Sequence, residues 1–402
     1  MKKAFKLFDR KIIIAVLFLA ITFYIGASEF LIAGRNVFTY FADRKAGILS
    51  IQKRVDEEYR NMLTFAGDIL KNKGSYINLN GFMARAMGQR YINDRVKLDN
   101  GHLAGIANKV DVTLAAAQVT KLFNSQTKKG KNFLFILAPS QVPKYENIMP
   151  KGLIDYSNQN ADNLIETLTS NGVPVLDLRE EARKDNLSHS DMFYKTDHHW
   201  KVESAFWAYQ KIVYYLTDKQ IIDPIPPMYT DINQYKFDIF KDLFLGSSGR
   251  RTGIFYTGLD DFTIITPKYE TKIHYNAPKR NISKEGSFED SVIDYKMLNE
   301  NYFASDPYSA YAYANTNYGI YRNPSAPCKL KLLTIHDSFA RPSNTFLSLV
   351  FSEQDTLDMR DYNEKFEEYY SGFAPDILIV FINANGIKSK NTTYDFFGDL
   401  KG

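Results

Sequence analysis

The chain has 402 residues, of which 45% are hydrophobic, so it is long enough to bury one large core or two smaller ones. Its formal net charge of +4 is small for this length, and no long basic run is interleaved with stacking aromatic residues, so nucleic acid is not an expected partner. The single cysteine, Cys328, excludes an intrachain disulfide framework and any multi-cysteine zinc site.

The N-terminus combines a basic tip with an apolar run. Five cations occur within residues 1–11, and residues 12–27 carry no charge. Extended to Gly34, the run has about the twenty residues that a helix needs to span hydrocarbon, and the basic flank keeps the N-terminus in the cytoplasm. We therefore expect residues 1–34 to form a cytoplasmic tip and a single-pass membrane anchor. The small residues Gly26-Ala27-Ser28 favour a cleaved signal peptide as the alternative. In both cases the rest of the chain lies outside the cytoplasm.

The next segment, residues 35–74, is predicted to be a helical stalk, because its apolar residues recur every three to four positions with charges between them. The remaining residues, 75–402, alternate strand-like and helix-like patterns after an Asn100-Gly101 hairpin turn. The expected helices are 110–126, 163–168 and 200–216, and the expected strands are 133–138, 173–178, 330–335 and 376–382. Such alternation predicts an α/β fold with a mostly parallel sheet, helices on both faces and a site at the carboxyl ends of the strands.

The stretch Phe193-Tyr-Lys-Thr-Asp-His-His-Trp200 gathers two imidazoles, a carboxylate and an indole in a protein that has only six histidines. If the stretch is extended, Asp197 and His199 share one face and His198 points away. An aspartate that holds one ring nitrogen of a histidine fixes its tautomer and stabilises the imidazolium. We expect His198 to face away from the reacting groups, where it is packed or hydrogen-bonded, and Trp200 to pack at the start of the following helix.

Residues 218–327 hold more than half of the prolines and many tyrosines, so we interpret them as an irregular insertion over the catalytic edge. Within them, Gly246-Ser-Ser-Gly-Arg-Arg-Thr-Gly253 is rich in glycine and hydroxyl groups. It lacks the lysine of a nucleotide-binding loop, but Gly246 and Arg250 are candidates for lining the site. A flexible, solvated turn is the alternative. Tyrosines at 256, 308, 311 and 313 are either core residues or platforms that stack on sugar rings.

Farther along, the β-prone run 329–335 ends abruptly in His336-Asp337-Ser338 and is followed by a helix-like stretch. A serine at a strand-turn-helix junction exposes its hydroxyl at the carboxyl end of the strand, near a helix N-terminus that favours developing negative charge. Ser338 is therefore the candidate nucleophile, and its own amide is the simplest donor to an oxyanion. Further oxyanion candidates are Arg360, Asn383 and Asn385.

With these motifs, the chain resembles the DHHW family of SGNH-hydrolase-like proteins, which is related to alginate-type polysaccharide O-acetyltransferases. The tetrapeptide Asp197-His198-His199-Trp200 is similar to the motif that names the family, and Asp337-Ser338 resembles its Gly-Asp-Ser block, with His336 in place of the glycine. The resemblance implies an SGNH-like α/β/α sandwich. It also implies Ser338 as nucleophile, His199 as base and Asp197 as its orienter. Because the aspartate and histidine precede the serine, the motif order resembles the circularly permuted alginate type.

Three functions follow from these residues. The first is an O-acetyltransferase that uses an acetyl-serine and neither cofactor nor metal to modify an exopolysaccharide or cell-wall glycan. It requires a membrane partner that carries acetyl groups outward, because acetyl-CoA is cytoplasmic. The second is a carbohydrate acetylesterase in which water accepts the acetyl group from the same triad. The third is a non-catalytic protein that binds glycan, or that holds a metal with Asp197, His198, His199 and His189.

Overall fold

The structure is a computed structural model with two units, Met1–Leu79 and Asn80–Gly402. It describes residues 73–314, 317–362, 364–387, 394 and 396, together with six isolated positions between 16 and 27. The predicted anchor and almost all of the predicted stalk lie outside the described residues. In the part of the chain that is described, no helix has both the length and the apolar character needed to cross a membrane.

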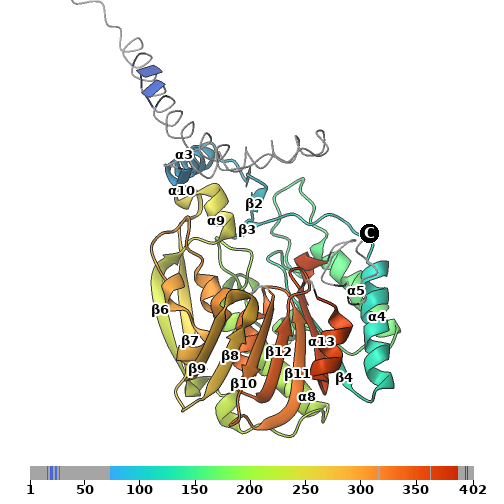
Figure 1. Ribbon diagram of the computed structural model, residues 1–402. Coiled ribbons are helices and arrows are strands. Elements are labelled where there is room, and N and C mark those ends of the chain that lie inside the picture. Colours follow the sequence, from blue (N-terminus) through green and yellow to red (C-terminus); the bar gives the residue numbers. More distant parts are fainter. Residues whose placement is uncertain are drawn as a thin grey trace, which may run out of the picture. The chain divides into compact units, whose positions relative to one another are not determined.

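The second unit is built on an eight-stranded mixed sheet (Figure 1). Its strands, in spatial order, are β5 (Val175–Asp177), β4 (Asn132–Ala138), β13 (Ile377–Asn383), β11 (Cys328–His336), β12 (Phe351–Leu357), β10 (Tyr318–Arg322), β8 (Ile273–Ala277) and β9 (Ile282–Gly286). The first five run parallel to one another, and the last three add antiparallel pairs. The prediction of a mostly parallel sheet in an α/β fold is confirmed.

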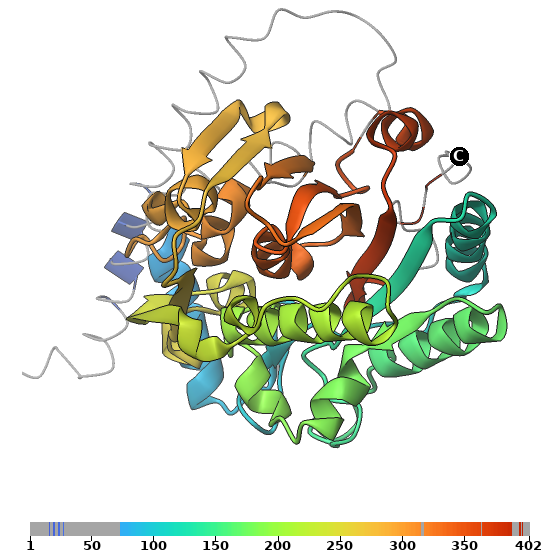
Figure 2. The same cartoon turned by 90° about the horizontal axis from the view of Figure 1, so that it is seen from below.

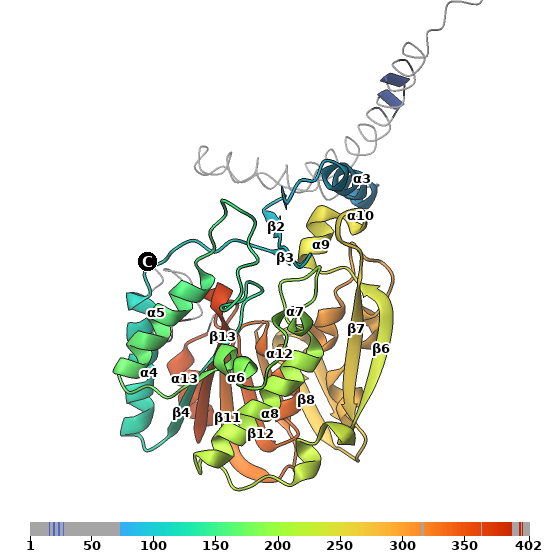
Figure 3. The same ribbon diagram turned by 180° about the vertical axis from the view of Figure 1, so that it is seen from behind.

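Two hydrophobic cores lie on opposite faces of this sheet. Along β4, Phe133, Phe135 and Leu137 belong to one core, and the alternate residues Leu134, Ile136 and Ala138 belong to the other. The first core includes α4 (Thr113–Lys128), α5 (Ser157–Ser170) and α13 (Phe366–Phe373). The second includes α6 (Leu178–Lys184), α8 (Val202–Asp218) and α12 (Ala340–Leu347). Figures 2 and 3 show helices on both sides of the strands. A strand that is buried on both faces has to be apolar throughout, which explains the uninterrupted apolar pattern of β4.

The region that was expected to be irregular, 218–327, contains five strands. Of these, β8, β9 and β10 extend the main sheet, and β6 (Tyr235–Phe244) pairs with β7 (Asp260–Pro267) in a separate ribbon. The expectation is wrong because the prolines lie at element boundaries, as at the end of β7, where a missing N–H is tolerated. Many tyrosines are core residues: Tyr256, Tyr275, Tyr308, Tyr311 and Tyr321 are each no more than 1% exposed.

The predicted hairpin is confirmed, with Gly101 at φ 87° between β2 (Arg95–Lys97) and β3 (Leu103–Ala104). The predicted helices and strands of the sheet core are present, with their ends shifted by a few residues; the largest change is at α5, which starts at Ser157 because Asp155 accepts a hydrogen bond from the Ser157 amide. The remaining α-helices and strand that the structure describes are α3 (Lys73–Ala86), β1 (Tyr91–Ile92), α7 (His189–Met192), α9 (Ser247–Thr252), α10 (Ile254–Thr257) and α11 (Phe288–Val292).

Candidate active site

Ser338 lies at the turn between β11 and α12, as predicted. The turn is fixed by Asp337, whose Oδ1 accepts a hydrogen bond from the Phe339 amide at 2.9 Å. Its Oδ2 accepts from the Asn383 backbone and side-chain nitrogens at 2.8 and 2.5 Å, which ties the turn to the end of β13. His336 is buried, and its Nδ1 hydrogen bonds with the Asp337 carbonyl. The carboxylate of Asp337 therefore serves the backbone of the turn, and Ser338 is left at its apex.

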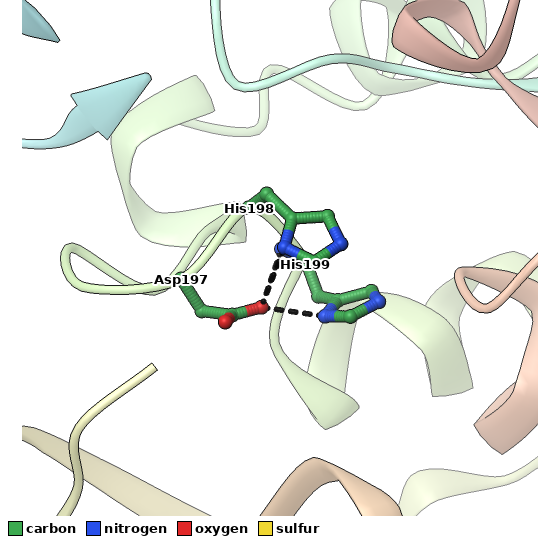
Figure 4. Close-up of side chains that lie close together, drawn as sticks. All are labelled: Asp197, His198 and His199. Carbon is green, nitrogen blue, oxygen red and sulfur yellow. Dashed lines mark hydrogen bonds and ion pairs between the residues drawn. The ribbon is translucent and has the colours of Figure 1, made fainter. Parts of the chain in front are cut away.

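The segment Asp197–Trp200 brings an aspartate onto a histidine by a tight bend (Figure 4). The expectation of an extended segment is wrong here. Asp197 Oδ1 accepts a hydrogen bond from the backbone amide of His199 at 2.9 Å, which is the local turn that aspartate side chains favour. The same oxygen lies 2.5 Å from His199 Nδ1. Aspartate and histidine therefore meet because the chain folds back, whereas the prediction relied on strand alternation.

His199 bridges Asp197 and Ser338. Its Nε2 lies 2.7 Å from Ser338 Oγ, across 139 positions of sequence. Because Nδ1 donates its proton to the carboxylate, Nε2 is the acceptor and the serine hydroxyl is the donor. Burial would raise the pKa of Asp197, but the His198 and His199 rings and the hydrogen bonds from His199 and the Ser247 amide outweigh it and hold the pKa well below its ordinary value. The carboxylate is therefore charged where an imidazolium would form.

The segment Gly246–Gly253 supports Asp197 from the other side. The Ser247 amide donates to Asp197 Oδ2 at 2.5 Å, and the Gly246 amide donates to Thr196 Oγ1 at 2.8 Å. A Cβ added to Gly246 would lie 2.2 Å from the Cβ of Asp197, so only glycine fits at this position. Instead of a flexible turn, most of the segment is the helix α9. Gly246 thus contacts the aspartate and its backbone neighbours, and its amide is already engaged.

A buried carboxylate that the sequence analysis missed, Asp260, anchors the start of the motif. It accepts hydrogen bonds from the amides of Lys195 and Thr196 and from Thr196 Oγ1, at 2.9, 2.8 and 2.7 Å. Burial raises the pKa of Asp260 above its ordinary value, because its effect is larger than the lowering by these donors. Asp260 is the first residue of β7, 63 positions beyond Asp197, and no local pattern in the sequence links the two.

The carbonyl of Phe339 joins the two halves of the site. It accepts a hydrogen bond from Trp200 Nε1 at 2.9 Å and one from the Tyr308 hydroxyl at 3.2 Å. The Tyr308 ring also stacks on His199, with centroids 4.0 Å apart and planes 12° apart. Trp200 is fully buried, as expected of a packing residue. Tyr308 is buried as well, so it supports the histidine and is not a platform for sugar. The sequence analysis could not single out Tyr308 for this role, because many other tyrosines lie near it in the sequence.

Three of the remaining candidates are engaged elsewhere. The Arg360 guanidinium pairs with Asp358, through Nε at 2.8 Å and Nη2 at 2.5 Å, just beyond the end of β12. Arg250 donates to the Ser305 carbonyl at 2.6 Å. Asn383 holds Asp337, as described above, and its Oδ1 accepts from the Gly386 amide. The structure therefore brings together Asp197, His199 and Ser338, and it gives Arg250 and Asn383 structural partners.

His198 lies beside His199 but does not take part in the contacts that link Asp197 to Ser338. Its ring centroid is 3.8 Å from that of His199, its Nδ1 lies 2.8 Å from Ser247 Oγ, and its side chain is 45% exposed. Possible metal ligand atoms of Asp197, His198 and His199 lie within 4.8 Å of one another. However, both Asp197 oxygens accept hydrogen bonds and His199 Nε2 faces Ser338. The arrangement fits a proton relay better than a cation site.

One family model matches part of the chain. Residues 106–234, which include Asp197–Trp200 but not Ser338, match the family model described as SGNH hydrolase-like domain, acetyltransferase AlgX. The match confirms the resemblance to SGNH-hydrolase-like proteins. No curated protein sequence matches the chain.

Solved structures of similar fold cover most of the second unit. PatB1 of Bacillus cereus, solved with a sulfonyl adduct, has 18% identity and a TM-score of 0.61, over 74% of this chain and 98% of that chain. A DHHW family protein of Eubacterium siraeum has 17% identity and a TM-score of 0.54, over 76% of this chain and 95% of that chain. At these identities the likeness concerns the fold alone.

Proposed function

We propose that this protein is a serine-dependent O-acetyltransferase that moves an acetyl group onto a hydroxyl of an exopolysaccharide or cell-wall glycan outside the cytoplasm. The observation that carries the proposal is the relay of Asp197, His199 and Ser338, with distances of 2.5 and 2.7 Å. Three such groups in this order are the arrangement that activates a serine for acyl transfer. The match of residues 106–234 to an acetyltransferase family model supports the same reaction class.

In the first half-reaction, Ser338 Oγ attacks the carbonyl carbon of an acetyl ester or thioester while its proton passes to His199 Nε2. The charge of Asp197 stabilises the imidazolium through Nδ1. The tetrahedral intermediate collapses when the bond to the leaving group breaks, and the leaving group takes the proton from Nε2. In the second, an acceptor hydroxyl gives its proton to Nε2 and attacks the acetyl-serine, and Ser338 then regains its proton.

The oxyanion of each tetrahedral intermediate requires hydrogen-bond donors. We assign the backbone amide of Ser338 to this role, because within the described residues it has no other partner and it stands next to the reacting oxygen. Arg250 and Asn383 are less suited, since both already donate to fixed acceptors. Arg360 is also committed to Asp358.

The position of the protein in the cell is part of the proposal. The basic tip and apolar run of residues 1–34 favour a single-pass anchor in the cell membrane with residues 75–402 outside. A second membrane protein then has to supply acetyl groups from the cytoplasm. We further infer a circularly permuted motif order in an SGNH-like three-layer sandwich, since Asp197 and His199 precede Ser338 in the chain.

The test is intact-mass spectrometry of the protein after incubation with an activated acetyl ester, with and without a panel of oligosaccharides. We expect a mass increase of one acetyl group that maps to Ser338 and that is discharged faster onto sugar than onto water. The Ser338→Ala variant should form no adduct at this position, and full activity in this variant would overturn the proposal.

Two alternatives give different results in the same experiment. An acetyl-serine that is lost equally fast without sugar favours a carbohydrate acetylesterase. If no adduct forms in any condition, the motif is non-catalytic, and metal analysis should then examine Asp197, His198 and His199, whose ligand atoms cluster within 4.8 Å.

A further inference from the structure

A groove of about 520 Å³ opens beside the relay. His198 and Ser247 form its wall on the side of the relay, and Arg95 and Arg251 contribute cationic side chains. Asn108 and Asn385 add amide groups that suit sugar hydroxyls. This volume lies within the range of pockets that hold small ligands. No aspartate or glutamate is among the described residues that line the groove, and the charges of Asp94 and Asp197, which act on Arg95, lie outside this lining.

The two arginines differ from those of the second unit that pair closely with carboxylates. Arg90, Arg179, Arg322 and Arg360 each form an ion pair with a carboxylate at 2.5–2.8 Å. Neither Arg95 nor Arg251 forms an ion pair with any residue that the structure describes. Burial lowers the pKa of the Arg95 guanidinium, and the charge of Arg251 lowers it further. Two cations that repel each other at a cavity wall are stabilised when an anion enters between them.

The fold holds Arg95 in a fixed orientation. Its Nε donates to Ser248 Oγ at 2.9 Å, and its Nη1 donates to the Asp94 carbonyl at 2.7 Å. Arg251 belongs to the same helix as Ser248, and its carbonyl accepts a hydrogen bond from Asn93 Nδ2 at 2.7 Å. Residues 93–95 and α9 are therefore joined directly. A guanidinium that is oriented in this way loses little conformational freedom when it binds a ligand.

The helix α9 also connects the cationic wall to the relay. Ser247, its first residue, donates its amide to Asp197 Oδ2, and its hydroxyl contacts His198 Nδ1. The His198 ring in turn lies against His199. The cationic wall and the relay are therefore linked through one helix and one ring contact, so an anion held by the arginines would lie on the same side of the site as His198.

We infer that the groove is a subsite for an anionic group of the acceptor, so that the acceptor is an acidic glycan whose carboxylate or phosphodiester binds Arg95 and Arg251. This inference rests on the proposed O-acetyltransferase activity and names its substrate class. A guanidinium pair suits both anions because each presents two oxygens to the planar fork. The acetyl group would then be placed on a hydroxyl near the charge.

The experiment measures selectivity between acceptors with the full-length chain in detergent. An oligogalacturonate trisaccharide competes with its carboxyl-reduced form for the acetyl group of acetylated Ser338, and mass spectrometry gives the ratio of the two products. A glycerol phosphate trimer is run in parallel to distinguish a phosphodiester from a carboxylate. We expect one of the two anionic acceptors to be preferred over the neutral one by at least about tenfold, as is typical of a charged hydrogen bond, and the preference to fall as salt is added.

Matched variants locate the effect. Arg251→Gln should reduce the preference by about tenfold. Arg280→Gln removes the same charge from an exposed position between β8 and β9, and it should leave the preference as it is. Binding is measured separately on a Ser338→Ala background by equilibrium dialysis of each trisaccharide, where loss of both arginines should abolish the difference between the acidic and the reduced form.

The outcomes separate this inference from the proposed function. If Ser338 is acetylated and discharged equally well onto acidic and neutral acceptors, the anionic subsite is wrong and the transferase stands. An unchanged preference in Arg251→Gln would also overturn the subsite. If Ser338 is never acetylated, the proposed function fails, and the dialysis experiment still reports whether the groove binds anions.

Discussion

The two halves of the candidate site are held by different means. The turn at Ser338 is held mostly by nearby structure: Asp337 bonds the Phe339 amide two residues away, a strand and a helix enclose the turn, and Asn383 is the distant residue that bonds Asp337. The segment that carries Asp197 and His199 depends on distant residues, because Ser247 bonds Asp197 from 50 positions away and Asp260 bonds the preceding Thr196 from 64 positions away. The nucleophile therefore depends on its own strand, turn and helix together with one distant partner, Asn383, whereas the base depends on several distant residues. This difference predicts which substitutions act on chemistry alone and which act through the fold.

The largest effect is expected at the base itself. His199→Ala removes the proton acceptor of Ser338, and we expect acetyl transfer to fall by about ten-thousandfold with no loss of folding. The matched change His198→Ala leaves the relay intact, so it should cost less than about tenfold. Steady-state transfer rates, with circular dichroism as a check on folding, decide between them. If His198→Ala proves the more damaging change, the assignment of the base is wrong.

A smaller effect on rate, but a larger one on stability, is expected at Gly246. An added Cβ would meet Asp197 Cβ at 2.2 Å, and the backbone has to move to relieve the contact. We expect Gly246→Ala to reduce transfer about a hundredfold, because the histidine shifts with its aspartate, and to lower the free energy of unfolding by about 2–4 kcal/mol.

The control for this change is Gly372→Ala in α13, where an added Cβ meets nothing within 4 Å. It should stabilise the protein by up to about 1 kcal/mol and leave transfer unchanged. Denaturant unfolding measures both variants. Equal effects at the two glycines would show that the aspartate does not depend on tertiary support.

The contact between Tyr308 and the Phe339 carbonyl, which links the two halves of the site, is tested by Tyr308→Phe. The variant keeps the ring that stacks on His199 and removes the hydroxyl that donates to the Phe339 carbonyl at 3.2 Å. We expect a loss of about 1 kcal/mol of stability and a three- to tenfold decrease in kcat/KM. Tyr275→Phe removes a similar buried bond, to the Ala312 carbonyl at 3.0 Å, and should cost stability without changing kcat/KM. A decrease in both variants would assign the effect to the core in general.

The smallest effect lies outside the relay and concerns the stability of the fold at acidic pH. Burial lowers the pKa of His102 to about 4, below its value of about 6.5 in the unfolded chain. Above pH 6.5 both states are neutral. Between about pH 6.5 and 4 only the unfolded chain binds the proton, so stability falls as the pH falls through this window.

We expect His102 to contribute a loss of about 1–3 kcal/mol between pH 7 and pH 4. The His102→Gln variant should show a shallower decline when unfolding free energies are measured across this range. A decline as steep as that of the original chain would show that other groups account for the acid sensitivity.

The same division between local and distant support explains what the sequence predicts. Ser338 could be identified because a strand, a turn and a helix follow one another within a few residues. Asp197 and His199 could be paired because they are two positions apart, although the reason given, strand alternation, is wrong. Asp260 and Tyr308 could not be found, because they reach the motif only after β7 and the residues before β10 have folded against it. The role of Gly246 was likewise hidden, since its requirement is a contact across 49 positions.

The separation of His199 and Ser338 by 139 positions has a consequence for synthesis. A chain that has been made only as far as β10 holds the base and its orienter but no nucleophile. Even after Ser338 is made, the turn stays unsecured until β13 brings Asn383 to Asp337. The site is thus completed by the last strand of the sheet, and contacts over such distances along the chain make folding slow. Order of synthesis alone keeps the nascent chain inactive until nearly all of it has emerged.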